Sequence, residues 1–118
     1  MANFPSTLNY YLSFTGYANN YTRYYLFYDN NTQLNTQKRL IDNSEVCIVG
    51  FGKIYFGKNH AVLMFGYEIK SDSSSVSDIR TIYYHDPWYG SARQATLNQW
   101  ADYTLVTSYR TSIAKAAF

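Results

Sequence analysis

Two apolar segments joined by a serine-rich loop constrain the fold most strongly. Residues 60–69 and 79–84 are rich in β-branched and aromatic side chains, and residues 71–78 between them read SDSSSVSD. This pattern is typical of two antiparallel strands and a solvated hairpin loop. The first strand begins at His60, and the second returns the chain to deliver Asp86. We therefore expect the imidazole and the carboxylate to lie near the same end of the hairpin.

The chemistry of His60 and Asp86 makes this end of the hairpin the candidate active site. A carboxylate that accepts the imidazole N–H fixes the tautomer and the orientation of the ring. This arrangement is the base and its orienting group from a nucleophilic triad, so both are candidate catalytic residues. Two alternatives stay open. His60 can be a hydrogen-bonded histidine at a sheet edge, and Asp86 can be a turn residue that binds its own backbone.

Residues next to this pair are candidates for substrate binding. Residues 86–90 read Asp-Pro-Trp-Tyr-Gly, and Asn59 directly precedes His60. Trp88 and Tyr89 either wall a substrate cleft beside the histidine or only cover the turn. The substrate-binding candidates are Trp88, Tyr89 and Asn59.

A metal site at this place is a weaker interpretation. His60, His85 and Asp86 could be drawn as three ligands, but neighbouring residues on a strand point to opposite faces. No further ligand follows at a metal-binding spacing. We therefore expect His85 to be exposed or structural, and we expect no metal and no cofactor.

The single cysteine, Cys47, excludes an intrachain disulfide and a cysteine-based zinc cluster. It lies within the apolar run of residues 46–49, where burial raises the pKa of a thiol and disfavours the thiolate. Cys47 is therefore expected to be a small core residue rather than a nucleophile. Ser6 and Ser13 are weaker candidates still for that role.

Composition excludes several classes of protein. The 118 residues suit one domain, and 47% hydrophobic with 15% charged residues argues against disorder. The ten basic residues are scattered along the chain, which disfavours nucleic-acid binding. The N-terminus lacks a signal-peptide pattern, and no apolar run approaches the roughly 20 residues of a membrane span. We expect a soluble chain without membrane association. Its localisation stays open, including secretion with the leader absent from this sequence.

The remaining segments predict an α+β domain over residues 1–118. Two short N-terminal helices pack against a strongly twisted antiparallel sheet or half-barrel in this interpretation. Besides the hairpin strands, the predicted elements are a helix over residues 6–15, a strand over 24–28, a helix from 31 or 32 to 41, a strand over 46–51, a helical turn or loop over 95–100 and a final strand over 103–109.

The ordered set of motifs resembles the C-terminal half of a papain-like cysteine peptidase, most closely the bacterial C39-like group. In that group a histidine opens an apolar strand that ends in Gly-Tyr, as His60 and Gly66-Tyr67 do here. A following strand ends in Asp-Pro, as at Asp86-Pro87. The helix ending at Asp42 and the strand of residues 46–50 are also similar. The resemblance covers roughly residues 34 to 107 and implies the C-terminal lobe of the papain-like fold.

The resemblance implies peptide-bond hydrolysis by a thiolate, with His60 as general base and Asp86 holding its ring. The family's cysteine begins a helix early in the domain, and a glutamine upstream supplies an oxyanion donor. This sequence has no such segment. We therefore expect the N-terminal cysteine-bearing lobe to be absent and the thiol to come from a missing segment or a partner chain. The alternatives are an inactive peptidase-like module that binds peptides or other proteins, and a self-contained domain with an accidental similarity.

Overall fold

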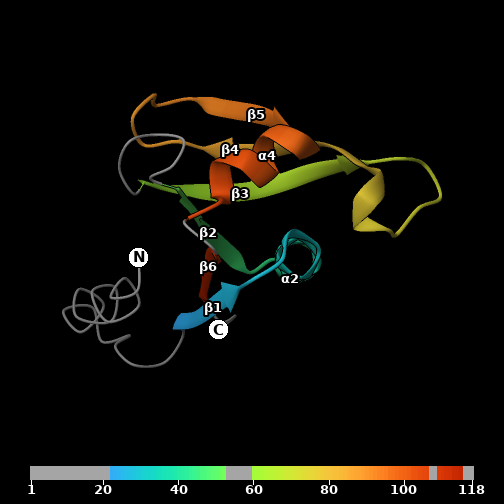
Figure 1. Ribbon diagram of the computed structural model, residues 1–118. Coiled ribbons are helices and arrows are strands. Elements are labelled where there is room, and N and C mark those ends of the chain that lie inside the picture. Colours follow the sequence, from blue (N-terminus) through green and yellow to red (C-terminus); the bar gives the residue numbers. More distant parts are fainter. Residues whose placement is uncertain (1–21, 53–59, 107–108, 116–118) are drawn as a thin grey trace.

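The computed structural model describes residues 22–52, 60–106 and 109–115 as one sheet with helices packed on it (Figure 1). In chain order the elements are β1 (Thr22–Phe27), α2 (Asn30–Asp42), β2 (Val46–Phe51), β3 (His60–Ile69), the 3-10 helix η2 (Val76–Asp78), β4 (Ile79–His85), β5 (Ala92–Thr96), α4 (Leu97–Thr104) and β6 (Arg110–Lys115). Several sequence predictions lie outside the described residues: the helix over 6–15, Ser6, Ser13 and Asn59.

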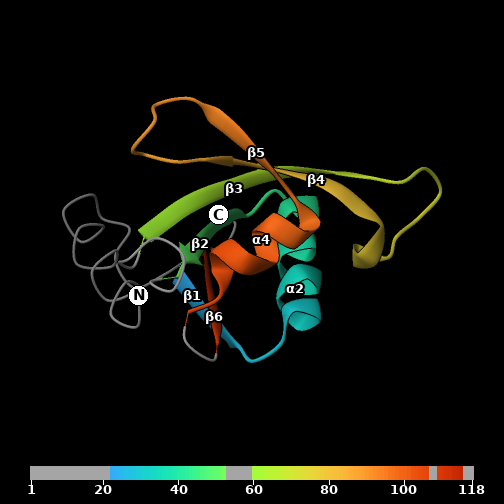
Figure 2. The ribbon, with the colours of Figure 1, turned by 45° about the horizontal axis from the view of Figure 1, so that its top comes forward.

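The described strands form one open antiparallel sheet in the order β1-β6-β2-β3-β4-β5. The sheet is strongly twisted. In Figure 1, β3 and β4 run across the view, whereas β6 runs at a steep angle to them. Both α2 and α4 pack on one face of the sheet and lie next to each other (Figure 2). The α+β fold with a twisted antiparallel sheet is therefore confirmed. None of the described helices is long and apolar enough to cross a membrane.

The hydrophobic core follows the two-residue alternation of the central strands. Cys47 and Val49 of β2 lie opposite Met64 and Val62 of β3, and all four are buried. Their neighbours along each strand point to the other face of the sheet, where Leu63 is exposed. Cys47 is thus the small core residue that the sequence predicts.

A second set of buried contacts between the helices and the sheet is polar. The Trp100 indole N–H donates to Gln37 Oε1 at 3.0 Å, and Gln37 Nε2 donates to the Ser112 hydroxyl at 2.9 Å. One turn earlier on α2, Gln33 Nε2 donates to the Thr104 hydroxyl at 3.0 Å. All five side chains are buried, so we call them the glutamine network. It joins α2, α4 and β6.

A bulge divides β3 into two halves. Met64 lies opposite Tyr84, but Gly66 lies opposite Tyr83, so Phe65 is an extra residue in the ladder. Before the bulge, the even-numbered residues of β3 face the core, and after it Tyr67 packs against the core instead. The extra residue therefore lets both halves of one strand face the same helices.

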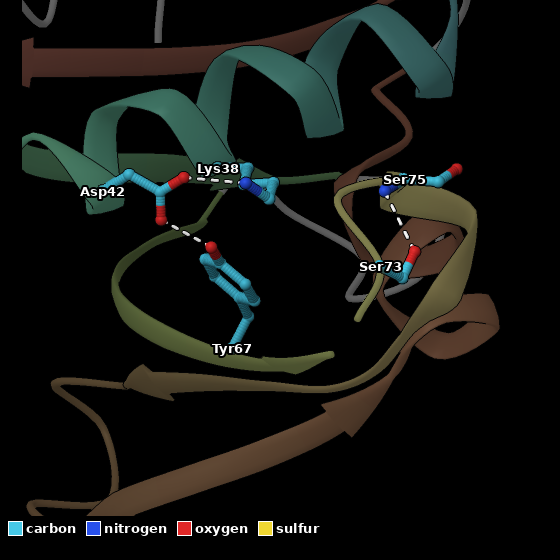
Figure 3. A network of polar contacts seen from close by, with 5 residues as sticks. All are labelled: Lys38, Asp42, Tyr67, Ser73 and Ser75. Atoms are coloured by element: carbon cyan, nitrogen blue, oxygen red, sulfur yellow. Dashed lines mark hydrogen bonds and ion pairs between the residues drawn. The ribbon is translucent and has the colours of Figure 1, made fainter. Parts of the chain in front are cut away.

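The second half of β3 is tied to the end of α2 (Figure 3). The Tyr67 hydroxyl donates to Asp42 Oδ1 at 2.5 Å, and the Lys38 ammonium pairs with Asp42 Oδ2 at 2.8 Å. Burial raises the pKa of Asp42, but these two hydrogen bonds outweigh it and hold the pKa below its ordinary value. In the following loop, the Ser75 amide donates to the Ser73 hydroxyl at 3.1 Å, so the serine-rich loop is internally bonded.

The strand predicted over residues 103–109 is wrong. Helix α4 continues to Thr104, and Val106 pairs with Tyr109 in an isolated bridge before β6 begins. The helix is fixed at its start by a capping box, in which Thr96 and Gln99 bind each other's backbone N–H groups at 3.2 and 2.9 Å. Of the residues predicted as a helical turn or loop over 95–100, residues 97–100 begin this helix, whereas residues 95 and 96 end β5.

Candidate functional site

The two ends of the β3–β4 hairpin meet at His60 and Asp86. His60 begins β3 opposite Phe51 of β2, and Asp86 directly follows β4. His60 Nε2 lies 2.7 Å from Asp86 Oδ1, and the two residues are only 7% and 4% exposed. The predicted proximity of the pair is confirmed. Its catalytic role stays a prediction.

Both side chains lie on the face of the sheet that carries the core. On β3 this face presents His60, Val62 and Met64, and on β4 it presents Ile82 and Tyr84, four and two residues before Asp86. The described residues of β3 and β4 that share this face with His60 are therefore apolar or aromatic as far as Asp86. A carboxylate is held strongly by hydrogen bonds in such surroundings, because water competes little for it.

The turn after β4 holds the Asp86 carboxylate in place. Besides His60, Asp86 Oδ1 accepts the backbone N–H of Trp88 at 2.9 Å. The Asp86 carbonyl accepts the N–H groups of Tyr89 and Gly90 at 3.0 and 3.4 Å. Gly90 has φ +67, a conformation in which glycine has no steric penalty. Asp86 is thus both a turn residue that binds its own backbone and the partner of the histidine, so the two interpretations of it are compatible.

Trp88 covers the histidine. Its ring stacks on the imidazole with centroids 3.5 Å apart and planes 23° apart. Phe51 contributes a second aromatic neighbour, 6.1 Å from the imidazole and buried. Trp88 remains 51% exposed, and its ring shields one face of the His60 imidazole. It therefore does more than cover the turn.

Tyr89 is the next residue of the same turn, and its backbone N–H donates to the Asp86 carbonyl. It is 58% exposed, and the guanidinium of Arg93 lies over its ring, 4.0 Å from the centroid. The third predicted substrate-binding residue, Asn59, is outside the described ranges. The structure thus brings Trp88 against His60 and places Tyr89 beside a basic residue that the sequence did not single out.

Cys47 does not reach the candidate site. It precedes Phe51, the strand partner of His60, by four residues on β2, which corresponds to about 14 Å along an extended strand. Burial raises the pKa of the Cys47 thiol from 9.0 to about 12. A thiol that is fully buried, protonated at neutral pH and this far along the strand is no nucleophile for the His60 site.

The arrangement of the histidines disfavours the metal interpretation. His85 points away from Asp86, is exposed, and stacks on Phe65 with ring centroids 4.5 Å apart. In the described parts of the chain no three histidine, cysteine, aspartate or glutamate side chains gather as metal ligands would.

Two residues of the site escaped the sequence analysis. Phe51 ends an apolar strand, and nothing in its pattern marks it as the neighbour of His60. Arg93 lies on β5, whose sequence Ala-Arg-Gln-Ala-Thr lacks the alternation that marks a half-buried strand. The strand β5 is defined by its pairing with β4, in which Arg93 lies opposite Tyr84.

No family model matches the chain, and neither the curated proteins nor the solved structures give a match. The chemistry of the site therefore has to be inferred from its own residues.

Proposed function

We propose that the chain is the His/Asp-bearing portion of a papain-like, C39-like cysteine peptidase, whose thiol is supplied by a further segment or a partner chain. The observation that carries this proposal is the buried contact of 2.7 Å between His60 Nε2 and Asp86 Oδ1 under the Trp88 ring. A histidine held in this way has one tautomer and one orientation, which is what general-base catalysis requires.

In the proposed reaction, proton transfer passes through Nδ1 of His60, because Nε2 contacts Asp86. His60 takes the proton of the incoming thiol, and the thiolate attacks the peptide carbonyl. The imidazolium then gives this proton to the leaving amine as the C–N bond breaks. Water, deprotonated by the same imidazole, cleaves the thioester and releases the acid and the thiol. Throughout, the Asp86 carboxylate stabilises the imidazolium and keeps the ring in place.

Trp88 supports this chemistry by limiting water. Hydrogen bonds between charged groups are stronger where water is excluded, and the stacked indole excludes it from one face of the imidazole. The backbone N–H of Trp88 also fixes the carboxylate that orients the ring. One residue thus serves the pair through its side chain and through its backbone.

The alternative function is a peptidase-like module that binds peptides or other proteins without cleaving them. The position of Cys47 favours it, because the only cysteine of the chain is buried about 14 Å along the strand from the candidate site. The chain alone is then inactive in either case. The two functions differ in whether His60 can activate a thiol that is added.

A thiol-rescue experiment tests the proposal. The chain is mixed with a peptide p-nitrophenyl ester and a small thiol such as cysteamine, and release of p-nitrophenol is followed. We expect thiol-dependent acceleration over the reaction without protein, reduced at least about tenfold in His60→Ala, because general-base catalysis typically contributes 10²–10⁴-fold.

Two variants serve as matched controls. His85→Ala removes the exposed neighbouring histidine, and Cys47→Ala removes the only endogenous thiol. Both are expected to keep the acceleration. Equal rates for the unmodified chain and His60→Ala, together with intact folding, would contradict the peptidase proposal and leave the binding module.

A further inference from the structure

We propose that Arg93, stacked on Tyr89 beside the His60–Asp86 pair, recognises a carboxylate in the leaving-group half of the substrate. The ligand class is a peptide with an acidic residue, or a free terminal carboxylate, just after the scissile bond. This inference rests on the proposed function, which it makes more specific.

The register places Arg93 on the same face of the sheet as the catalytic candidates. On β5, Ala95 is buried opposite Ile82, and Arg93, two residues earlier, lies opposite Tyr84. Asp86 follows Tyr84 by two residues. The β4–β5 ladder ends with the pair His85–Ala92, so Arg93 lies one residue inside this end and Asp86 one residue beyond it. Arg93 therefore lies at the same end of the sheet as Asp86.

The guanidinium of Arg93 is held in a way that leaves its donors available. The guanidinium carbon lies over the Tyr89 ring, 4.0 Å from its centroid. A cation–π contact of this kind orders the side chain and needs no hydrogen bond from the guanidinium N–H groups. Among the described residues, no carboxylate lies within ion-pair distance of Arg93.

The positive charge of Arg93 favours an acidic ligand. Within the described ranges no ion pair joins Arg93 to Asp86, whose Oδ1 accepts from His60 and from the Trp88 backbone N–H. A carboxylate that approaches an arginine edge-on can form two parallel hydrogen bonds, which a neutral amide cannot match.

The position of Trp88 indicates which half of the substrate would reach Arg93. The group that protonates the leaving amine must lie within hydrogen-bond distance of it. Trp88 stacks on that imidazole, and Tyr89 with its partner Arg93 continues the same exposed turn. Substrate atoms that follow the scissile bond would therefore pass over this aromatic surface towards the arginine.

Binding of matched peptides tests the inference. The peptides Ala-Ala-Gly-Asp-Ala-Ala and Ala-Ala-Gly-Asn-Ala-Ala, both with blocked termini, differ by one charge. A second pair, tetra-alanine with a free or an amidated C-terminus, distinguishes a terminal carboxylate from a side-chain one. Dissociation constants follow from calorimetry. We expect the Asp peptide or the free-terminus peptide to bind about three- to tenfold tighter than its neutral partner, as exposed charge-assisted contacts allow.

Substitutions assign this preference to one residue. Arg93→Met keeps an apolar stem over Tyr89 and removes the charge, so the ratio of the two constants should fall to about one. Arg80→Met removes another exposed arginine, near the opposite end of β4, and should leave the ratio unchanged.

Three outcomes would overturn the inference: equal binding within both peptide pairs, an unchanged ratio in Arg93→Met, or no binding of either acidic peptide at millimolar concentration. None of them depends on catalysis. The thiol-rescue experiment with His60→Ala reports separately on the proposed function, so the two failures can be told apart.

Discussion

The glutamine network and the His60–Asp86 pair are both buried and polar, yet they differ in chemistry and in place. The network joins neutral amide, hydroxyl and indole groups in the middle of the helix–sheet interface. The pair joins two ionisable groups at the end of a hairpin, under an aromatic ring that is half open to solvent. Neutral groups fix the packing of α2 and α4 without a charge to desolvate, whereas the site carries groups that can exchange protons.

The largest expected effect concerns the network. Gln37→Ala leaves the Trp100 indole N–H and the Ser112 hydroxyl without their partner and should lower the free energy of unfolding by about 2–4 kcal/mol. Asn35→Ala on the exposed side of α2 is the control and should change it by no more than about 0.5 kcal/mol. Urea unfolding measures both. Equal effects of the two substitutions would show that the network does not hold the helix in place.

A smaller loss is expected at the site. Asp86→Ala removes the acceptor of His60 and of the Trp88 N–H and should cost about 1–2 kcal/mol in the same assay. Asp86→Asn keeps an oxygen for both contacts and should cost less. A loss in Asp86→Ala greater than that in Gln37→Ala would invert the comparison and make the pair a main support of the fold.

The smallest effect is expected at an exposed carboxyl outside both clusters. Asp29 caps α2, and its Oδ1 accepts the backbone N–H of Thr32 at 2.7 Å. This hydrogen bond is the largest cause that lowers the pKa of Asp29, and the hydrogen bond from the Thr32 hydroxyl is the second. A lowered folded-state pKa stabilises the fold above the ordinary value of 3.8, and this contribution is lost as the pH falls through the lowered pKa. Asp29→Ala should therefore reduce the melting temperature slightly at pH 7 and hardly at all at pH 2. A difference that grows towards low pH would contradict the capping role.

The pair was predictable from the sequence because the hairpin is a local feature. Two strands joined by a short polar loop must return the chain to its starting end, so His60 and Asp86 could be expected to lie near each other before any coordinates were known. The α+β class followed from the same segments. The loop brings the two ends of the hairpin together, and the register of β3 on β4 places both side chains on one face.

The glutamine network and β5 were not predictable for a physical reason. Glutamine is usually exposed, and Gln33 and Gln37 become buried only because Thr104 and Ser112, distant in sequence, supply their partners. Likewise, the polar strand β5 gains its conformation from β4, not from its own residues. Arg93 and its position near the site depend on that long-range pairing.

The bulge at Phe65 changes which residues of β3 face the helices: even-numbered residues before it and odd-numbered residues after it. Loss of a single residue there would remove the register shift between Met64 and Gly66, but only one half of the strand could then keep its orientation. If Tyr67 held its contact with α2, the imidazole would turn to the side of the sheet that lacks α2 and α4, away from Asp86. Phe65, the unpaired residue in the middle of β3, thus determines to which face of the sheet His60 points.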